Sequence, residues 1–211
     1  GDSDFVEVPV QRLIDPRHAA ARVRDIDVHK ASVSRPMAQP SGQGQDTTHF
    51  SILDAEGNRV AATLSINYPF GSGFVAAGTG VLLNDEMDDF SIKPGTPNVY
   101  GLVGNEANAI APGKRMLSSM SPTFIEGPER IAILGTPGGS RIISMLLIAT
   151  LQALQDTPVE QWVGRARFHH QYLPDQIQFE PGALSAETQQ VLQRKGHRLK
   201  ELSSSYGNMQ A

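Results

Sequence analysis

The stretch TTHFSILDAEGNRVAATLSI, residues 47–66, decides how the fold is organised. Its two halves are rich in β-branched and apolar residues, and the DAEG segment between them, residues 54–57, is typical of a turn. This pattern predicts a β-hairpin whose first strand begins at Thr47. We expect the hairpin to belong to the core.

Two further apolar strands are predicted downstream of the hairpin, at residues 80–83 and 130–134. The second strand leads directly into the turn TPGGS, residues 136–140. The sequence IISMLLIATLQAL that follows, residues 142–154, is apolar almost all round. It predicts a helix that is buried against a sheet.

Three shorter helices complete the expected elements. The first follows the Asp15-Pro16 pair and ends near Asp27, and the other two cover residues 159–166 and 186–195. Strands that come first, with long helices laid over them, predict an α+β fold of helix layers on sheet layers, not a doubly wound parallel sheet. No GxGxxG or Walker loop is present, so no nucleotide cofactor is predicted.

Composition narrows the classes of function. The 211 residues suit one compact domain with appendages. The formal net charge of -4 gives no electrostatic reason to bind nucleic acid or an anionic membrane. The absence of cysteine excludes disulfides, thiolate metal sites and thiol catalysis. No stretch approaches the roughly 18 apolar residues of a membrane-spanning helix, so a soluble chain is expected, and a signal sequence could precede Gly1 in a longer parent protein.

The segment before the hairpin points to a possible nucleophile. Residues 30–46, KASVSRPMAQPSGQGQD, contain almost no apolar side chains and are predicted to form a mobile linker. If the bond between Asp46 and Thr47 is cut, the new α-amine of Thr47 has a pKa of roughly 7.7 to 8.0 and is partly neutral near pH 7. That amine can serve as the base for its own hydroxyl. A linker that simply meets a strand is the plainer interpretation of these residues alone.

Six segments carry a resemblance to a known family. They are TTHFS from Thr47, NYPFGSG from Asn67, GVLLNDEMDDFS from Gly80, KRMLSSMSPT from Lys114, LGTPGGSRI from Leu134 and RFHHQYLPD from Arg167. In this order and spacing, residues 47–202 resemble the small subunit of γ-glutamyltransferases, and residues 4–46 resemble the tail of the large subunit.

The resemblance implies a fold and a partner. The fold is that of an N-terminal-nucleophile hydrolase, an αββα sandwich of stacked antiparallel sheets flanked by helices, of which this chain would hold a part. Residues 1–46 would be the large-subunit tail and linker, and residues 47–211 the catalytic domain of the small subunit. The expected partner is the remainder of the large subunit from the same precursor.

The catalytic residues also follow from the resemblance. Thr47 matches the nucleophile, which first attacks the carbonyl of Asp46 to cut the chain and later forms a γ-glutamyl ester. Ser65 stands where the family usually has a threonine whose hydroxyl supports the nucleophile. Gly138 and Gly139 match the pair whose backbone amides form the oxyanion hole. A turn that opens a helix would aim free amides and the positive end of the helix dipole at one point, although two glycines can also simply make a tight turn.

The same comparison assigns the substrate-binding residues. Asn67, Glu86 and Asp89 match positions that bind the α-amino group of the substrate, and Ser118 and Ser119 match serines that hydrogen-bond its α-carboxylate. Charge-assisted hydrogen bonds of this kind would select the zwitterionic end of a γ-glutamyl group. Without the resemblance, these residues would be interpreted as a solvated acidic turn and a polar loop.

Several alternatives stay open. An acid at Asp89 favours γ-glutamyl substrates over those of the related acylases that remove a glutaryl group from cephalosporins, because glutaryl has no α-amine. Tyr100 lies where some members of the family have a lid over the pocket. The pair His169 and His170 does not predict a metal site, because adjacent side chains diverge and no third ligand has a characteristic spacing.

A third possibility is an unprocessed or truncated homologue that acts as a binding or structural subunit. In the family, an arginine of the large subunit completes carboxylate binding, and no motif in residues 1–46 supplies it. Members of the family usually continue for a strand or two beyond YGNMQA. Bacterial members work in the periplasm or outside the cell, which is the expectation for this chain.

Overall fold

The computed structural model describes residues 2–34, 47–96 and 104–211. The helices are α1 Val10–Ile14, α2 Pro16–Val23, α3 Ile142–Leu154, α4 Val159–Gly164 and α5 Ala186–Arg194, and the 3-10 helices are η1 Glu86–Asp89, η2 Glu106–Asn108 and η3 Gly139–Arg141. The strands are β1 Thr47–Leu53, β2 Arg59–Ser65, β3 Thr123–Glu126, β4 Ile131–Leu134, β5 Phe168–His169, β6 Ile177–Phe179 and β7 Leu199–Glu201.

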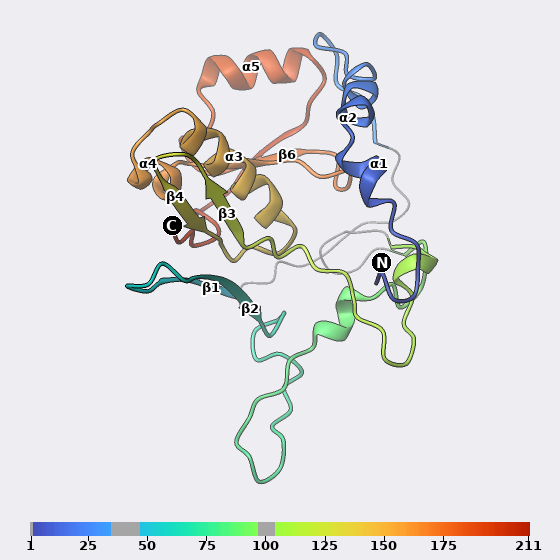
Figure 1. Cartoon of the computed structure of the whole chain (residues 1–211). Coiled ribbons are helices and arrows are strands. Elements are labelled where there is room, and N and C mark those ends of the chain that lie inside the picture. Colours follow the sequence, from blue (N-terminus) through green and yellow to red (C-terminus); the bar gives the residue numbers. More distant parts are fainter. Residues whose placement is uncertain (1, 35–46, 97–103) are drawn as a thin grey trace.

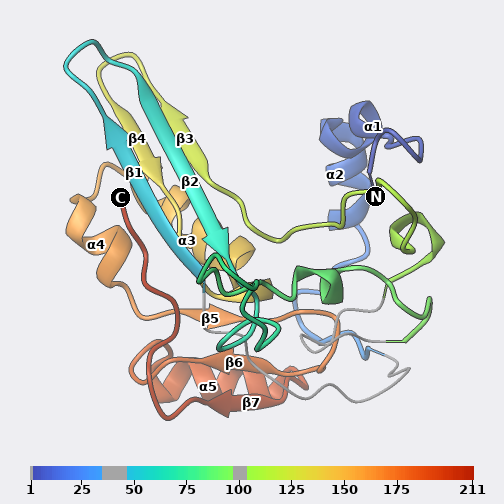
Figure 2. The same ribbon diagram turned by 90° about the horizontal axis from the view of Figure 1, so that it is seen from below.

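The strands form three small sheets. Strands β1 and β2 make the predicted antiparallel hairpin, β3 and β4 make a second one, and β5, β6 and β7 make a mixed sheet in which β6 and β7 are parallel. Figures 1 and 2 show the β3–β4 hairpin stacked between the β1–β2 hairpin and helix α3. The layers therefore run from sheet to sheet to helix, as an α+β sandwich requires.

The core lies where α3 meets β4 and the C-terminal segment. Its buried side chains are Leu134, Ile142, Met145, Leu146, Ala149, Ala153, Trp162, Tyr206 and Met209. Residues of the last ten positions thus pack beside a helix that is some sixty residues earlier in the chain. This packing places the C-terminal segment next to the turn that leads into α3.

The predicted helix 142–154 forms and packs against β4, but one side of it is exposed. A stripe of Ile143, Leu147, Leu151 and Leu154 is exposed, at the spacing expected for one face of a helix. The reason is that the sheets and α4 cover α3 on its other faces only. Large apolar side chains of the β1–β2 hairpin, among them Leu53 and Leu64, are also exposed.

Residues 80–83 do not form the predicted strand. Leu82 makes only an isolated bridge with Val75, within a narrow loop that the chain closes on itself. Gly78 and Gly80, at the tip of this loop, have positive φ angles of 76° and 72°, which interrupt extended backbone. The other predicted elements agree with the structure to within two residues, except that α2 ends at Val23 and not near Asp27, whereas α1, β3, β5, β6 and β7 were not predicted.

The predicted linker is held in place at its start. The amide of Ala31 donates to the carbonyl of Lys195 over 2.6 Å, and the amide of Ser34 donates to the Asp175 carboxylate over 2.8 Å. Two hydrogen bonds thus join Ala31 and Ser34 to the C-terminal part of the chain, and the predicted mobility of the linker stays a prediction. Residues 35–46 lie outside the described part of the chain. None of the described helices is long and apolar enough to cross a membrane.

Candidate active site

The register of the β1–β2 hairpin brings two hydroxyl groups together. Thr47 is the partner of Ser65 in the ladder, and their Oγ1 and Oγ atoms lie 2.9 Å apart. The backbone amide of Asn67 also donates to Ser65 Oγ, over 2.9 Å. Because a hydroxyl has one hydrogen and two lone pairs, Ser65 can accept from Asn67 and still donate to Thr47. That arrangement would stabilise negative charge that develops on the Thr47 oxygen.

A glycine turn follows strand β4 and leads into α3. Gly138 and Gly139 have φ angles of 144° and 57°, both in the region that favours glycine. A Cβ atom on Gly138 would lie 2.4 Å from Cε of Met145 in the core, so the Met145 side chain would have to move to admit any other residue. Amides at the start of a helix lack carbonyl partners within it and lie at its positive end. The turn can therefore stabilise an oxyanion in front of it.

One cavity joins the candidate nucleophile to this turn. It has a volume of about 310 Å³, and both Thr47 and Gly138 line it. His49, Arg141 and the C-terminal residues 205–208 and 210 form other parts of its wall. A carbonyl group in the cavity would thus have a hydroxyl on one side and the glycine turn on another, which is the arrangement that acyl transfer needs.

The acidic turn forms a second part of the site. Burial, the neighbouring charge of Glu86 and a hydrogen bond with that residue together raise the pKa of Asp89 to about 7. Oε1 of Glu86 and Oδ2 of Asp88 are buried without hydrogen-bond partners in the described part of the chain. Crowded, partly buried carboxylates of this kind favour a cation between them. A substrate ammonium group would satisfy this requirement.

One of the two predicted serines contacts the glycine turn. The Ser119 hydroxyl donates to the carbonyl of Gly139 over 3.2 Å, and the Ser118 hydroxyl accepts from the amide of Met120. The structure therefore brings Ser119 to the turn that Gly138 begins. A link between the acidic turn and the loop that carries both serines is made by another residue, Asn108.

Asn108 is a positioning residue that the sequence analysis missed. Its side-chain amide donates to the carbonyl of Asp89 over 2.8 Å and accepts from the amide of Leu117 over 3.0 Å. Asn108 is itself buried and joins the acidic turn to the serine loop. No pattern around it, in the segment NEANAI, distinguishes it from an ordinary loop asparagine.

His169 has a structural place behind the helix start. Gln171 Oε1 lies 2.9 Å from His169 Nε2 and accepts from Ser140 Oγ over 2.7 Å, while His169 Nδ1 lies 2.7 Å from Ser144 Oγ. Because an amide oxygen only accepts, Nε2 of His169 carries a hydrogen. Burial lowers the pKa of His169, which favours the neutral ring. The ring and Gln171 thus tether the first turn of α3, next to the glycine pair.

The comparisons with known proteins agree with this geometry. The family model described as Gamma-glutamyltranspeptidase matches residues 1–211. The chain belongs to the γ-glutamyltranspeptidase family. It is 44% identical to the glutathione hydrolase proenzyme of Escherichia coli over 216 residues, which cover 100% of this chain and 37% of that protein. This chain therefore spans little more than a third of the length of that relative.

Solved structures of the γ-glutamyltranspeptidase family confirm the predicted fold. A mutant of the Helicobacter pylori enzyme matches with a TM-score of 0.73 and 42% identity, over 77% of this chain and 88% of the other. A cephalosporin acylase from Bacillus halodurans matches with a TM-score of 0.79 over 99% of this chain and 36% of its own. At 23% identity, the second match shows a shared fold and nothing more.

Two predicted site residues of this γ-glutamyltranspeptidase chain cannot be placed. Asp46, on one side of the expected cleavage point, and Tyr100, the expected lid residue, both lie outside the described part of the chain. Within that part, no group of three or more His, Asp or Glu side chains could hold a metal ion. The roles assigned to the other residues by resemblance stay predictions.

Proposed function

We propose that this chain carries the nucleophile of a γ-glutamyltransferase that transfers or hydrolyses γ-glutamyl amides such as glutathione. The observation that carries the proposal is the contact of 2.9 Å between the Thr47 and Ser65 hydroxyls, beside a cavity that Gly138 also lines. After cleavage between Asp46 and Thr47, the free α-amine would take the proton of the Thr47 hydroxyl. The resulting γ-glutamyl ester would pass its acyl group to water or to an amine.

The partly buried acids of η1 favour a γ-glutamyl substrate over a glutaryl one. Burial and the charge of Glu86 hold the pKa of Asp89 at about 7, which is costly unless a cation binds there. The α-ammonium of a γ-glutamyl group supplies that cation, whereas a glutaryl group does not. The glutaryl acylase is thus the second candidate, and an uncleaved homologue that binds without turnover is the third.

The rest of the same precursor is the proposed partner. The relative from Escherichia coli is named a proenzyme, and this chain covers 37% of it. The exposed apolar stripe of α3 and the exposed side chains of the β1–β2 hairpin offer surfaces on which a large subunit could pack. We include in the proposal a location in the periplasm or outside the cell, which fractionation of the source cells would test.

A direct test compares two acyl groups on the full-length precursor. We expect the purified protein to contain two polypeptides, with the second beginning at Thr47, and to release anilide from a γ-glutamyl anilide. A glutaryl anilide should react at least about tenfold more slowly, because a lost ionic hydrogen bond costs about 1.5 to 3 kcal/mol. Intact mass spectrometry and product absorbance measure these results. An uncut, inactive protein, or a preference for glutaryl, would contradict the proposal.

The raised pKa of Asp89 predicts how substrate affinity depends on pH. Asp89, with a pKa of about 7, must lose its proton before it can pair with the substrate ammonium. We therefore expect KM for a γ-glutamyl anilide to fall as pH rises through about 7, and to rise by up to tenfold per pH unit below it. Asp89→Asn should raise KM and remove this dependence, whereas Glu106→Gln, at an exposed acid, should not. A wild-type KM that stays constant from about pH 6 to 8 would refute the interpretation.

A further inference from the structure

Arg141 places a positive charge in the wall of the cavity beside the candidate nucleophile. It is the last residue of η3, directly after the glycine turn and Ser140. The cavity lining includes Arg141 together with Thr47 and Gly138. No role was assigned to this arginine from the sequence, where it stands in the segment TPGGSRI.

Among the described residues, no carboxylate lies within ion-pair distance of the Arg141 guanidinium, and Glu180 acts on it only from farther away. Nη2 of Arg141 donates to the side-chain oxygen of Gln178, and the guanidinium carbon lies 4.6 Å from the centre of the Tyr206 ring. Burial lowers the pKa of Arg141, yet a guanidinium stays charged near pH 7. The hydrogen bond to Gln178 uses only some of the five N–H donors of Arg141.

None of the residues predicted to bind the γ-glutamyl group lines the cavity. These residues are the predicted α-amino and α-carboxylate contacts, Asn67, Glu86, Asp89, Ser118 and Ser119. Ser65 contacts both the Thr47 hydroxyl and the backbone amide of Asn67, so Asn67 lies on the Ser65 side of the nucleophile. If the γ-glutamyl group occupies that side, the cavity with Arg141 is left for the amine that leaves or enters.

We propose that Arg141 binds a carboxylate carried by the leaving amine and by the acceptor amine, so that the site prefers γ-glutamyl amides of amino acids and peptides to those of uncharged amines. This rests on the proposed function. A planar guanidinium fork pairs well with a carboxylate, and about 310 Å³ is at the small end of ligand pockets, which suits an amino acid or a dipeptide.

The proposed contact fits a balanced reaction. The bond between Thr47 Oγ1 and the γ-carbonyl carbon forms, and the amide C–N bond breaks. The proton of the Thr47 hydroxyl passes through its α-amine to the leaving nitrogen. An acceptor amine reverses these steps, with its own carboxylate on Arg141. The arginine fixes the position of that amine and takes no part in the proton transfer.

The first experiment uses two donors with the full-length precursor. Glutathione has a leaving group with a carboxylate, and a γ-glutamyl anilide without acidic substituents has none. We expect Arg141→Gln to lower kcat/KM for glutathione by about ten- to a hundredfold, the range for a lost ionic hydrogen bond. The value for the anilide should change by less than about threefold. For Arg141→Lys, which keeps the charge but not the planar guanidinium, kcat/KM for glutathione should lie between the values of the wild type and of Arg141→Gln. Rates are expressed per cleaved chain, measured by mass spectrometry.

A matched control is Arg130→Gln. Arg130 also lies over an aromatic ring, that of Trp162, and donates to a backbone carbonyl, that of Ala153, but it does not line the cavity. This variant should have the wild-type kcat/KM for both donors. Equal losses on both donors in Arg141→Gln, or no loss on either, would overturn the carboxylate contact while leaving the proposed function intact. A wild-type protein that uses neither donor would overturn the proposed function itself.

A second experiment needs no variant and remains decisive if Arg141→Gln does not fold. The wild-type enzyme is supplied with a γ-glutamyl anilide and either glycylglycine or its carboxamide as acceptor. We expect the free carboxylate to raise the transfer rate at equal acceptor concentration by about tenfold or more. Equal rates for the two acceptors would overturn the proposal.

Discussion

Replacing Thr47 with alanine in the full-length precursor should leave one uncut polypeptide that releases no anilide from a γ-glutamyl anilide. The change removes the oxygen that lies 2.9 Å from Ser65 Oγ, and with it the atom on which both the chain cleavage and the ester depend. Loss of a hydroxyl nucleophile lowers kcat by a factor on the order of 10⁶. Denaturing electrophoresis and product absorbance measure both parts of this prediction.

Two companion variants make the Thr47 result specific. Thr47→Ser keeps the hydroxyl and should retain cleavage and a measurable rate. Ser51→Ala removes another hydroxyl from the same strand, four residues farther along, where the side chain is exposed. It should cleave and turn over like the wild type. Cleavage before residue 47 in the alanine variant would show that another group cuts the chain, and the role assigned to Thr47 would be wrong.

The part of the site that could be predicted from the sequence depends on local geometry. The segment 47–66 predicts the hairpin, but a turn at residues 54–57 would place Thr47 opposite residue 64, and only the structure sets the register in which Thr47 faces Ser65. The glycine turn is local in the same way, because it lies between a strand and the helix that follows. The structure adds the measured contact and the positive φ angles.

The remaining parts of the site depend on contacts that no local pattern predicts. Asn108 bridges Asp89 and Leu117 across nine or more residues, and the C-terminal segment reaches the cavity after some sixty residues that follow the glycine turn. The roles proposed for Glu86 and Asp89 required the family resemblance, since an acidic turn alone is usually solvated. No local pattern assigns a role to Arg141, because its importance comes from the cavity that it lines.

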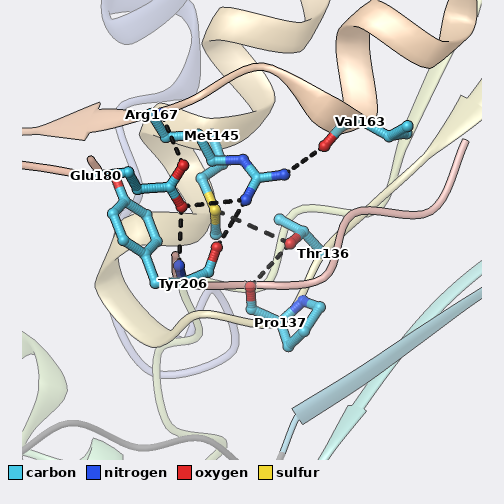
Figure 3. A network of polar contacts seen from close by, with 7 residues as sticks. All are labelled: Thr136, Pro137, Met145, Val163, Arg167, Glu180 and Tyr206. Carbon is cyan, nitrogen blue, oxygen red and sulfur yellow. Dashed lines mark hydrogen bonds and ion pairs between the residues drawn. The ribbon is translucent and has the colours of Figure 1, made fainter. Parts of the chain in front are cut away.

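A buried ion pair between Arg167 and Glu180 holds the C-terminal segment against the cavity. Glu180 accepts from the amides of Arg167 and Tyr206, each over 2.8 Å, and lies 3.3 Å from Nη1 of Arg167. Nη1 of Arg167 also donates to the carbonyl of Tyr206 over 2.7 Å. Figure 3 shows that Glu180 and Arg167 both bond to the backbone of Tyr206, with Thr136 and Pro137 nearby. Glu180 and Arg167 are 2% and 8% exposed, so water cannot replace the missing partner if one is removed.

We expect Glu180→Ala to lower the free energy of unfolding by about 3 to 5 kcal/mol, because it leaves a buried guanidinium unpaired and two backbone amides without acceptors. The control is Glu126→Ala, which breaks an exposed pair with Arg59 and should cost less than about 1 kcal/mol. Urea denaturation of the two variants and the wild type measures the difference. Since Tyr206 also lines the cavity, residual folded Glu180→Ala should show a raised KM for the acceptor. If Glu180→Ala is no less stable than Glu126→Ala, the network does not hold the C-terminal segment, and the wall of the cavity must owe its position to the apolar packing of Tyr206 and Met209 on α3 instead.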